Sequence, residues 1–340
     1  MRIILDGMGG DNAPEEIVKG AVQAAAEIDH EIIIVGKPEA IKKELERNKY
    51  SGNRILIEPA EEVITMEDSP VKAIRRKKDS SLVVGLSMLR DGRGDMFVSA
   101  GNTGALVVGA RLILGRIRGI DRPALASIYP NINGGEPGLL VDAGASSESK
   151  AKNLLEYALM GSIFVDKVWG RENPEVGLVN LGTEEGKGTS VTKDAFQMLK
   201  ESHLNFVGNV EGRDVPKGAC DVIVCDGFTG NVILKLTEGV AMSVFKRVKQ
   251  ALKSGIKSMI GGALVKSNLM ALKDEFDYEE YGGAPVLGVT MPVIKMHGSS
   301  TAKAVASAIK RGIPYAEENV VDIIKEEMLK VEEYIEIEEE

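Results

Sequence analysis

One pattern recurs along the chain: a short apolar run, a glycine-rich polar turn, and then apolar residues at helical spacing. The runs and turns occupy 2–6, 31–36, 95–104, 138–147, 175–182, 221–231 and 292–300. This alternation predicts an α/β protein with a largely parallel sheet flanked by helices. The runs lack polar alternation, which is typical of strands covered by helices on both faces. No low-complexity linker interrupts the pattern, so we expect a single domain over 1–340.

The polar turns follow the carboxyl ends of the predicted strands, where ligands of such sheets bind. Each turn also precedes a helix, whose free backbone N–H groups favour an anion. The first turn, DGMGGDNAP, offers Asp6, Gly9 and Gly10 as ligand-binding candidates. Its spacing differs from a dinucleotide fingerprint, because Asn12 stands where a third glycine is needed. A glycine-enabled turn with an aspartate cap is the alternative.

Two further turns, SAGNTGA and DGFTGNV, have closely similar chemistry. Their side chains offer neutral hydrogen bonds, and their glycines let a ligand approach the backbone. Helix capping is the structural alternative for either turn alone. Two such turns favour a binding site, with these candidate residues: Asn102, Thr103, Gly104, Asp226, Thr229, Gly230 and Asn231.

The turn NLGTEEGKGTS resembles a nucleotide-binding P-loop but has the wrong spacing. Only three residues separate Gly182 from Gly186, and Gly188 separates Lys187 from Thr189. This spacing argues against a nucleoside triphosphate and suits a smaller anion. Gly186 and Lys187 are therefore candidates for binding a small anion.

The turn MHGSS places His297 and Ser299 at a strand-to-helix junction. His297 is a candidate ligand or general acid, and a structural histidine is an equal alternative. The chain has no GxSxG motif, so neither serine is expected to act as a hydrolase nucleophile. Cys220 and Cys225 lack zinc spacing, and there is no HExxH motif. We expect no metal, and we read Cys225 as a small buried apolar residue.

Composition narrows the class of protein. A net charge of −9 and an aromatic content of 4% argue against nucleic acid as a partner. No apolar run reaches the length of a membrane span, and MRIILDGMGG enters a strand pattern without a secretory signal. Two cysteines argue against a disulfide scaffold and favour a reducing compartment. We expect a cytoplasmic protein.

Residues 243–273 differ from the rest of the chain, because they contain seven basic residues and no acidic residue. Apolar residues at helical spacing predict an amphipathic helical hairpin, with Gly261-Gly262 turning the chain. A basic amphipathic hairpin is typical of a membrane surface contact, and a dimer contact is the alternative. The expected contact residues are Lys253, Lys257, Met259, Ile260, Leu264 and Val265. A second basic cluster, 75–78, is a solvated face or a docking site for an acidic protein.

Taken together, these motifs resemble the bacterial phosphate acyltransferase family of phospholipid synthesis over the whole chain. The resemblance rests on ILDGMGGDNAP, SPVKAIRRKKDSS, SAGNTGA, VDAGA, NLGTEEGKG, NFVGNVEG, DVIVCDGFTGNVILKLTEG, YGGAPVLGV and HGSS. One departure is Ser146, which follows Gly-Ala where the family usually has asparagine. The resemblance implies a fold related to phosphotransacetylases and to isocitrate and isopropylmalate dehydrogenases. It also implies a homodimer at the inner face of the cell membrane.

The same resemblance implies the reaction of inorganic phosphate with an acyl carrier protein thioester, giving acyl phosphate and free carrier. A membrane-bound glycerol-3-phosphate acyltransferase would then use the acyl phosphate. Phosphate is itself the nucleophile, so the enzyme gains rate by positioning and needs no cofactor. We expect Lys187 to neutralise phosphate, and Asn102, Thr103, Asn231 and Ser299 to orient phosphate or carbonyl. The alternatives are another phosphate- or nucleotide-dependent α/β enzyme, or a non-catalytic membrane scaffold.

Overall fold

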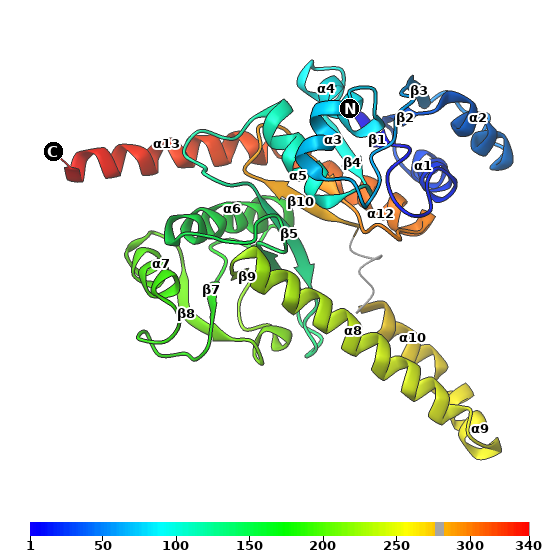
Figure 1. Ribbon diagram of the computed structural model, residues 1–340. Helices are drawn as coiled ribbons and strands as arrows, with labels where there is room; N and C mark the ends of the chain where they lie inside the picture. Colours follow the sequence, from blue (N-terminus) through cyan, green and yellow to red (C-terminus); the bar gives the residue numbers. More distant parts are fainter. Residues whose placement is uncertain (276–281, 340) are drawn as a thin grey trace.

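A continuous sheet of 11 strands forms the centre of the molecule (Figure 1). The computed structural model describes residues 1–275 and 282–339. The strands lie in the order β3-β2-β1-β4-β11-β10-β5-β6-β9-β7-β8. The strand β1 (Arg2–Asp6) is buried from Ile3 onward, as its unbroken apolar run predicts. The expected α/β architecture with a largely parallel sheet is confirmed.

The sheet has two parallel halves. The first consists of β3 (Ile55–Pro59), β2 (Glu31–Gly36), β1, β4 (Met96–Ser99) and β11 (Val293–Lys295). The second consists of β6 (Gly138–Val141), β9 (Val222–Val224), β7 (Val176–Asn180) and β8 (Phe206–Glu211). Between them lie β10 (Ala284–Leu287) and β5 (Ala124–Tyr129).

Strand direction reverses where the halves meet. The pairs β10–β11, β10–β5 and β5–β6 are antiparallel. The strands of the two halves therefore run in opposite directions along the hydrogen-bonded sheet. Sequence periodicity predicts strands but not their order, so this reversal was not foreseen.

Helices cover both sheet faces, each with its own hydrophobic cluster. One face carries α1 (Glu15–Glu27), α2 (Pro38–Arg47), α6 (Ala151–Trp169), α7 (Ser190–Glu201), α12 (Ala302–Glu317) and α13 (Val320–Glu339). The other carries α3 (Pro70–Arg76), α4 (Ser81–Arg90), α5 (Thr103–Gly109) and the π-helical turn η1 (Ala110–Leu114). A short 3-10 helix, η2 (Val215–Lys217), precedes β9.

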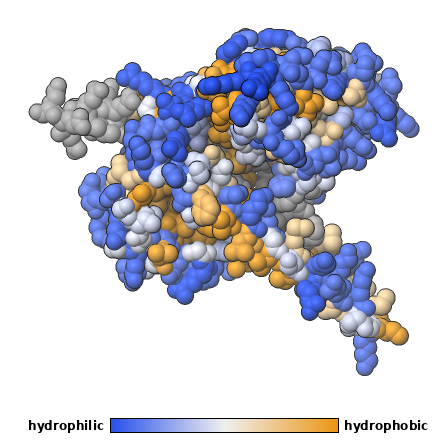
Figure 2. Space-filling model, in the orientation of Figure 1, coloured by the Kyte–Doolittle hydropathy of each residue, from blue (hydrophilic) through white to orange (hydrophobic). Residues whose placement is uncertain are grey.

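The hairpin expected at 243–273 is helical and projects from the body of the protein (Figure 1). It consists of the end of α8 (Gly227–Leu252), then α9 (Ile256–Leu264) and α10 (Lys266–Glu275). The apolar residues of α9 face solvent, with Ile256 and Leu264 nearly four-fifths exposed at 79% and 78%. Figure 2 shows hydrophobic residues at the far end of the projection.

The expected turn at Gly261-Gly262 is wrong, because both residues lie inside α9. The chain turns instead between Lys253 and Gly255, where α8 ends and α9 begins. A β-carbon at Gly262 would lie 3.2 Å from Leu252 Cβ, so this glycine lets α9 lie close to the end of α8. Among the described residues, no helix is long and apolar enough to cross a membrane.

The helices α1 and α12 pack tightly at Gly20. A β-carbon there would lie 2.5 Å from Val305 Cβ and 2.6 Å from the Ala302 carbonyl oxygen. Because Ala302 contributes backbone, the contact cannot be relieved by a rotamer change alone.

We therefore predict that Gly20→Ala lowers the free energy of unfolding by about 1–3 kcal/mol through overpacking. Gly239→Ala is the matched control, because a β-carbon at Gly239 in α8 would meet nothing within 4 Å. The control should raise stability by up to about 1 kcal/mol, since alanine favours helix over glycine. Urea unfolding midpoints measure both, and equal effects of the two substitutions would contradict the packing argument.

Candidate active site

A cavity of about 530 Å³ lies where the two halves of the sheet meet. One wall comes from the turns after β1, β4 and β11, and the other from β5, the turn after β6 and the first half of α8. The polar side chains of its lining are Asp11, Thr103, Ser127, Asn231, Lys235, Glu238, Lys295, His297 and Ser300. The cavity therefore collects polar groups from both halves.

Lys295 is the buried cation of this cavity, with a residue exposure of 6%. Its ammonium group donates to the Ala100 carbonyl at 3.2 Å and to the Met296 carbonyl. Burial lowers the pKa of Lys295 to about 8, and the negative charge of Asp6 opposes that lowering. A buried ammonium held by carbonyl dipoles is suited to bind an anion, which would supply the missing countercharge.

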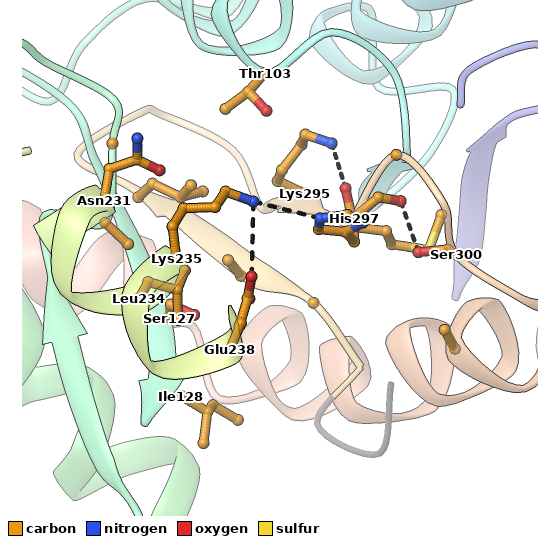
Figure 3. Close-up of a pocket in the computed structure, with 18 of the residues that line it drawn as sticks. Thr103, Ser127, Ile128, Asn231, Leu234, Lys235, Glu238, Lys295, His297 and Ser300 are labelled. Atoms are coloured by element: carbon orange, nitrogen blue, oxygen red, sulfur yellow. Dashed lines mark hydrogen bonds and ion pairs between the residues drawn. The ribbon is translucent and has the colours of Figure 1, made fainter. Parts of the chain in front are cut away.

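A second lysine, Lys235, extends from α8 toward the turn after β11 (Figure 3). Its Nζ lies 3.4 Å from His297 Nε2 and 3.7 Å from a Glu238 carboxylate oxygen. Partial burial raises the pKa of Glu238, and the positive charge of Lys235 opposes that increase. Two lysines thus contribute positive charge to one cavity.

His297 is held as a neutral ring. Partial burial lowers its pKa, and the nearby positive charges of Lys235 and Lys295 lower it further. The Nε2 atom faces the Lys235 ammonium group at 3.4 Å, and Nδ1 accepts from the Ser299 backbone N–H at 3.2 Å. The Nδ1 atom lies 2.8 Å from Ser299 Oγ, which orients the ring. The sequence candidates His297 and Ser299 are thus neighbours, and His297 lines the cavity.

Two other candidates from the sequence, Thr103 and Asn231, also line the cavity. Thr103 begins α5 in the first half, and Asn231 lies in the first turns of α8 in the second half. Figure 3 shows Thr103 and Asn231 at different sides of the cavity that also holds Lys235 and Lys295. They are placed to hydrogen-bond two parts of one ligand.

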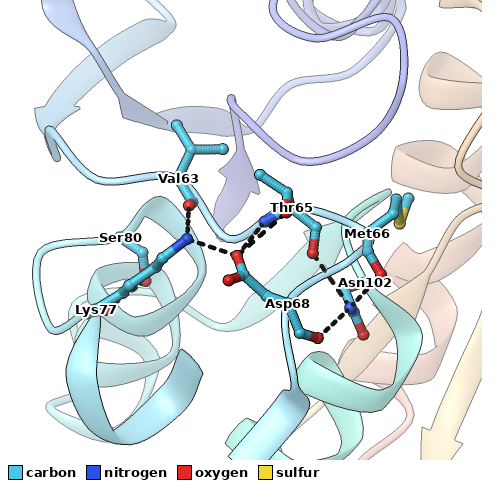
Figure 4. A network of polar contacts seen from close by, with 7 residues as sticks. All are labelled: Val63, Thr65, Met66, Asp68, Lys77, Ser80 and Asn102. Atoms are coloured by element: carbon cyan, nitrogen blue, oxygen red, sulfur yellow. Dashed lines mark hydrogen bonds and ion pairs between the residues drawn. The ribbon is translucent and has the colours of Figure 1, made fainter. Parts of the chain in front are cut away.

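Asn102 stabilises a loop instead of lining the cavity (Figure 4). Its Oδ1 accepts from the Ala105 N–H as the cap of α5, and its Nδ2 donates to the carbonyls of Thr65, Met66 and Asp68 at 3.1–3.2 Å. Lys77 ties the same loop through Asp68 at 2.5 Å. The loop carries Met66, a lining residue, so Asn102 positions the wall. Its neighbour Gly104 packs against Pro70.

The first turn is likewise a positioning element. Asp6 is buried, its carboxylate accepts from Ser99 Oγ at 2.7 Å and from the Met8 N–H at 3.2 Å, and burial raises its pKa. A β-carbon at Gly9 would lie 2.4 Å from Asp6 Oδ2. Gly10 has a φ of +102°, which favours glycine. Asp6, Gly9 and Gly10 do not line the cavity, but the turn that they form places Asp11 in its lining.

The turn after β9 contains a helix cap. Asp226 accepts from the Thr229 N–H at 2.9 Å and from Thr229 Oγ1 at 2.6 Å, which fixes the start of α8. Gly230 lies against the Asp142 carbonyl, where a β-carbon would approach to 2.0 Å. Asp226 and Thr229 therefore cap the helix, which was the structural alternative to ligand binding. Asn231, further along α8, lines the cavity.

Asp142 holds the turn after β6. Its fully buried carboxylate accepts from the backbone N–H groups of Leu125, Gly144, Ala145 and Ser146 at 2.8–3.0 Å. Ser146 Oγ donates to the same carboxylate at 2.9 Å, so the residue that departs from the family pattern has a structural partner here. This turn places Gly144 beside Asn231 at the cavity.

Lys187 and Gly186 do not line the cavity. Lys187 follows β7, which β9 separates from the central strands, and its side chain is 54% exposed and 3.8 Å from Glu184. Lys235 and Lys295 lie in the cavity, where we expected Lys187 to lie. A lysine between buried strand residues is unusual, so the lysine in VIKMHG could have marked Lys295 as a functional residue. Lys235 lies in an ordinary helical pattern, which gave no such signal.

Cys225 is buried, as expected, and burial raises the pKa of its thiol well above the usual value. The reactive form of cysteine is the thiolate, so this environment disfavours a nucleophilic role.

Solved structures with a similar fold are phosphotransacetylases. A phosphotransacetylase from Streptococcus pyogenes aligns over 94% of both chains with a TM-score of 0.66 and 17% identity. A branched-chain phosphotransacylase from Enterococcus faecalis aligns over 93% of this chain and 99% of its own, with a TM-score of 0.55 and 12% identity. The fold is thus that of phosphotransacetylases, as expected.

Sequence relatives identify the family. Residues 1–323 match the family model described as a fatty acid synthesis protein. A phosphate acyltransferase from Clostridium tetani is 50% identical over 98% of this chain and 99% of its own length, and one from Clostridioides difficile is 48% identical over 98% of both. The chain belongs to the phosphate acyltransferase family, and it is an acyltransferase.

We predict that Lys235→Met weakens the binding of inorganic phosphate by about 10- to 100-fold, the usual loss for a hydrogen bond to a charged group. Lys187→Met is the matched control and should change affinity less than about twofold, because Lys187 lies outside the cavity. Isothermal titration calorimetry measures both dissociation constants. A large effect at Lys187 with none at Lys235 would restore the assignment from the sequence.

Proposed function

We propose that this acyltransferase converts an acyl carrier protein thioester and inorganic phosphate into acyl phosphate and free carrier, for phosphatidic acid synthesis. The observation that carries the proposal is the meeting of Lys235, Lys295 and neutral His297 in one cavity between the halves of the sheet. Two ammonium groups attract phosphate, and the neutral imidazole can move a proton.

Phosphate binds between Lys235 and Lys295 in this proposal. Lys295 supplies a charge whose geometry is fixed by two carbonyl oxygens, and Lys235 supplies a movable one from α8. Glu238 counters Lys235 before phosphate arrives. Bound phosphate is thus held where its oxygen can face the thioester carbonyl, which lowers the entropic part of the barrier.

The chemical step forms one bond and breaks one. An oxygen of hydrogen phosphate attacks the thioester carbonyl carbon, and the carbon–sulfur bond of the tetrahedral intermediate then breaks. His297 accepts the phosphate proton and returns it to the thiolate, so the products are the acyl phosphate dianion and the free thiol. Asn231 or Thr103 donates to the carbonyl oxygen as negative charge develops on it.

Chemistry and surface charge support the choice of carrier substrate and of the next step in this proposal. Acyl carrier proteins are acidic, and Arg75 and Arg76 remain exposed at the end of α3. Lys77 of the same cluster is half-buried and paired with Asp68, so the docking role falls to the exposed Arg75, Arg76 and Lys78. Acyl phosphate is amphiphilic, so a membrane-bound glycerol-3-phosphate acyltransferase is a fitting consumer.

The exposed surfaces of the projecting helices favour two contacts. One is with a second subunit in a homodimer, and the other is with the cytoplasmic surface of a membrane. An exposed apolar stripe runs along α8 at four-residue spacing through Phe228, Val232, Leu236, Val240 and Val244. A second subunit would cover this stripe. At the far end, Met259, Ile260, Leu264 and Val265 are exposed beside Lys253, Lys257 and Lys266, which suits anionic lipid.

The decisive experiment incubates the protein with phosphate and a palmitoyl acyl carrier protein thioester. We expect phosphate-dependent formation of palmitoyl phosphate, followed by phosphorus NMR, together with one free carrier thiol for each acyl phosphate. Palmitoyl coenzyme A is the control for carrier recognition and should react more slowly. Equal rates with both thioesters would contradict the carrier assignment, and no acyl phosphate from either would contradict the reaction.

For the membrane contact, we predict that Lys253→Glu, Lys257→Glu and Lys266→Glu together release the protein from anionic liposomes in a sedimentation assay. Each lysine near an anionic surface contributes about 1 kcal/mol, so three reversals should weaken binding at least about 100-fold. Soluble turnover should persist.

The matched control reverses three exposed lysines far from the projection: Lys19, Lys42 and Lys43. It should stay bound to the liposomes. Sedimentation equilibrium should show a dimer for both triple variants. Unchanged liposome binding of the Lys253, Lys257 and Lys266 variant would rule out this membrane contact.

A further inference from the structure

A second pocket, of about 170 Å³, adjoins the cavity on the other face of the sheet. Ile128, Gly282 and Gly283 line both spaces. On β11, Lys295 faces the cavity and its neighbour Ile294 faces the second pocket, as alternation along a strand requires. Figure 3 shows Ile128 at the end of the cavity far from Thr103.

The second pocket is apolar and aromatic, in contrast to the cavity. Phe164 and Trp169 of α6 meet edge to face with ring centroids 6.0 Å apart, and Phe164 lies 5.5 Å from Tyr315 of α12. Val168 and Pro314 complete the wall, and Arg311 is the charged member of the lining. Aromatic residues make up only 4% of the chain, so this gathering is unusual for the protein.

Backbone pairing between β5 and β10 stops beside the two spaces. The strands β5 and β10 pair only at Leu125–Val286 and Ala124–Leu287. Beyond these pairs, Ser127 and Ile128 of β5 and Ala284 of β10 line the cavity without pairing to one another. The ends of β5 and β10 are thus unpaired with each other where the two spaces share their lining residues.

Two glycines line both spaces at this point. Gly282 and Gly283 precede β10 with φ values of +78° and +112°, where residues with side chains are strained. A β-carbon at Gly283 would also lie 2.9 Å from the Lys295 carbonyl oxygen. A larger residue at either position would be strained, and its side chain would occupy space between the cavity and the second pocket.

We propose that the second pocket receives the end of the substrate's linear acyl chain, which passes Ile128 and Gly283 from the cavity. The inference rests on the proposed function, because it takes the occupant of the cavity to be an acyl thioester. Such a substrate is polar at its carbonyl group, like the cavity, and apolar along its chain, like the second pocket. The pocket thereby sets the preferred chain length.

We predict that Val168→Phe shifts the enzyme toward shorter chains. Val168 is a half-buried wall residue of α6, and a larger ring would displace about two methylene groups. The ratio of kcat/KM for hexadecanoyl over octanoyl thioester should then fall about tenfold. Val207→Phe, the same change at an exposed position on β8, is the matched control and should leave the ratio unchanged.

A binding measurement on the unaltered protein tests the pocket without turnover. Trp169 is the only tryptophan of the chain, so its fluorescence reports this pocket alone. A hexadecanoic acid brominated at its far end should quench the fluorescence, whereas one brominated beside the carboxylate should quench it less.

The outcomes separate the pocket from the reaction. Acyl phosphate formation with neither a chain-length shift nor selective quenching would overturn the pocket and leave the function standing. Quenching by the end-brominated chain without acyl phosphate formation would support an alkyl-binding pocket and reject the reaction. Equal quenching by both brominated acids would also overturn the proposed direction of the chain.

Discussion

The reversal of strand direction at β10 and β5 is the constraint on which the rest of the structure depends. A uniformly parallel sheet presents all its carboxyl ends at one edge, and its ligand site lies along that edge. Here the antiparallel pairs turn one half against the other. The cavity therefore forms where the halves meet, and each half contributes polar groups to a different wall.

That placement explains why a cation can be buried in the cavity. Lys295 ends β11, the last parallel strand of its half, so its ammonium group reaches carbonyl oxygens at the junction. The buried charge of Asp6 on a nearby strand end offsets part of the cost. The Ala100 and Met296 carbonyl oxygens hold the ammonium group in place, and an anion in the cavity would complete its compensation.

Periodicity in the sequence predicted the strands, the helices and the class of fold, because burial on two faces leaves a direct mark on the order of apolar residues. It could not predict which turns would meet, since strand order depends on contacts between distant segments. Lys187 illustrates the limit: its glycine-rich turn looked suited to phosphate, but β9 separates its strand from the centre. Asn102 and Asp226 show the related ambiguity between a ligand residue and a helix cap.

The helix α8 joins the cavity to the far end of the projection without a break. Lys235 lies near its start and Leu252 ends it, so 17 residues at about 1.5 Å each separate them by roughly 26 Å. A continuous helix of this kind acts as a fixed spacer. The start of α9 is therefore held at that distance from the cavity.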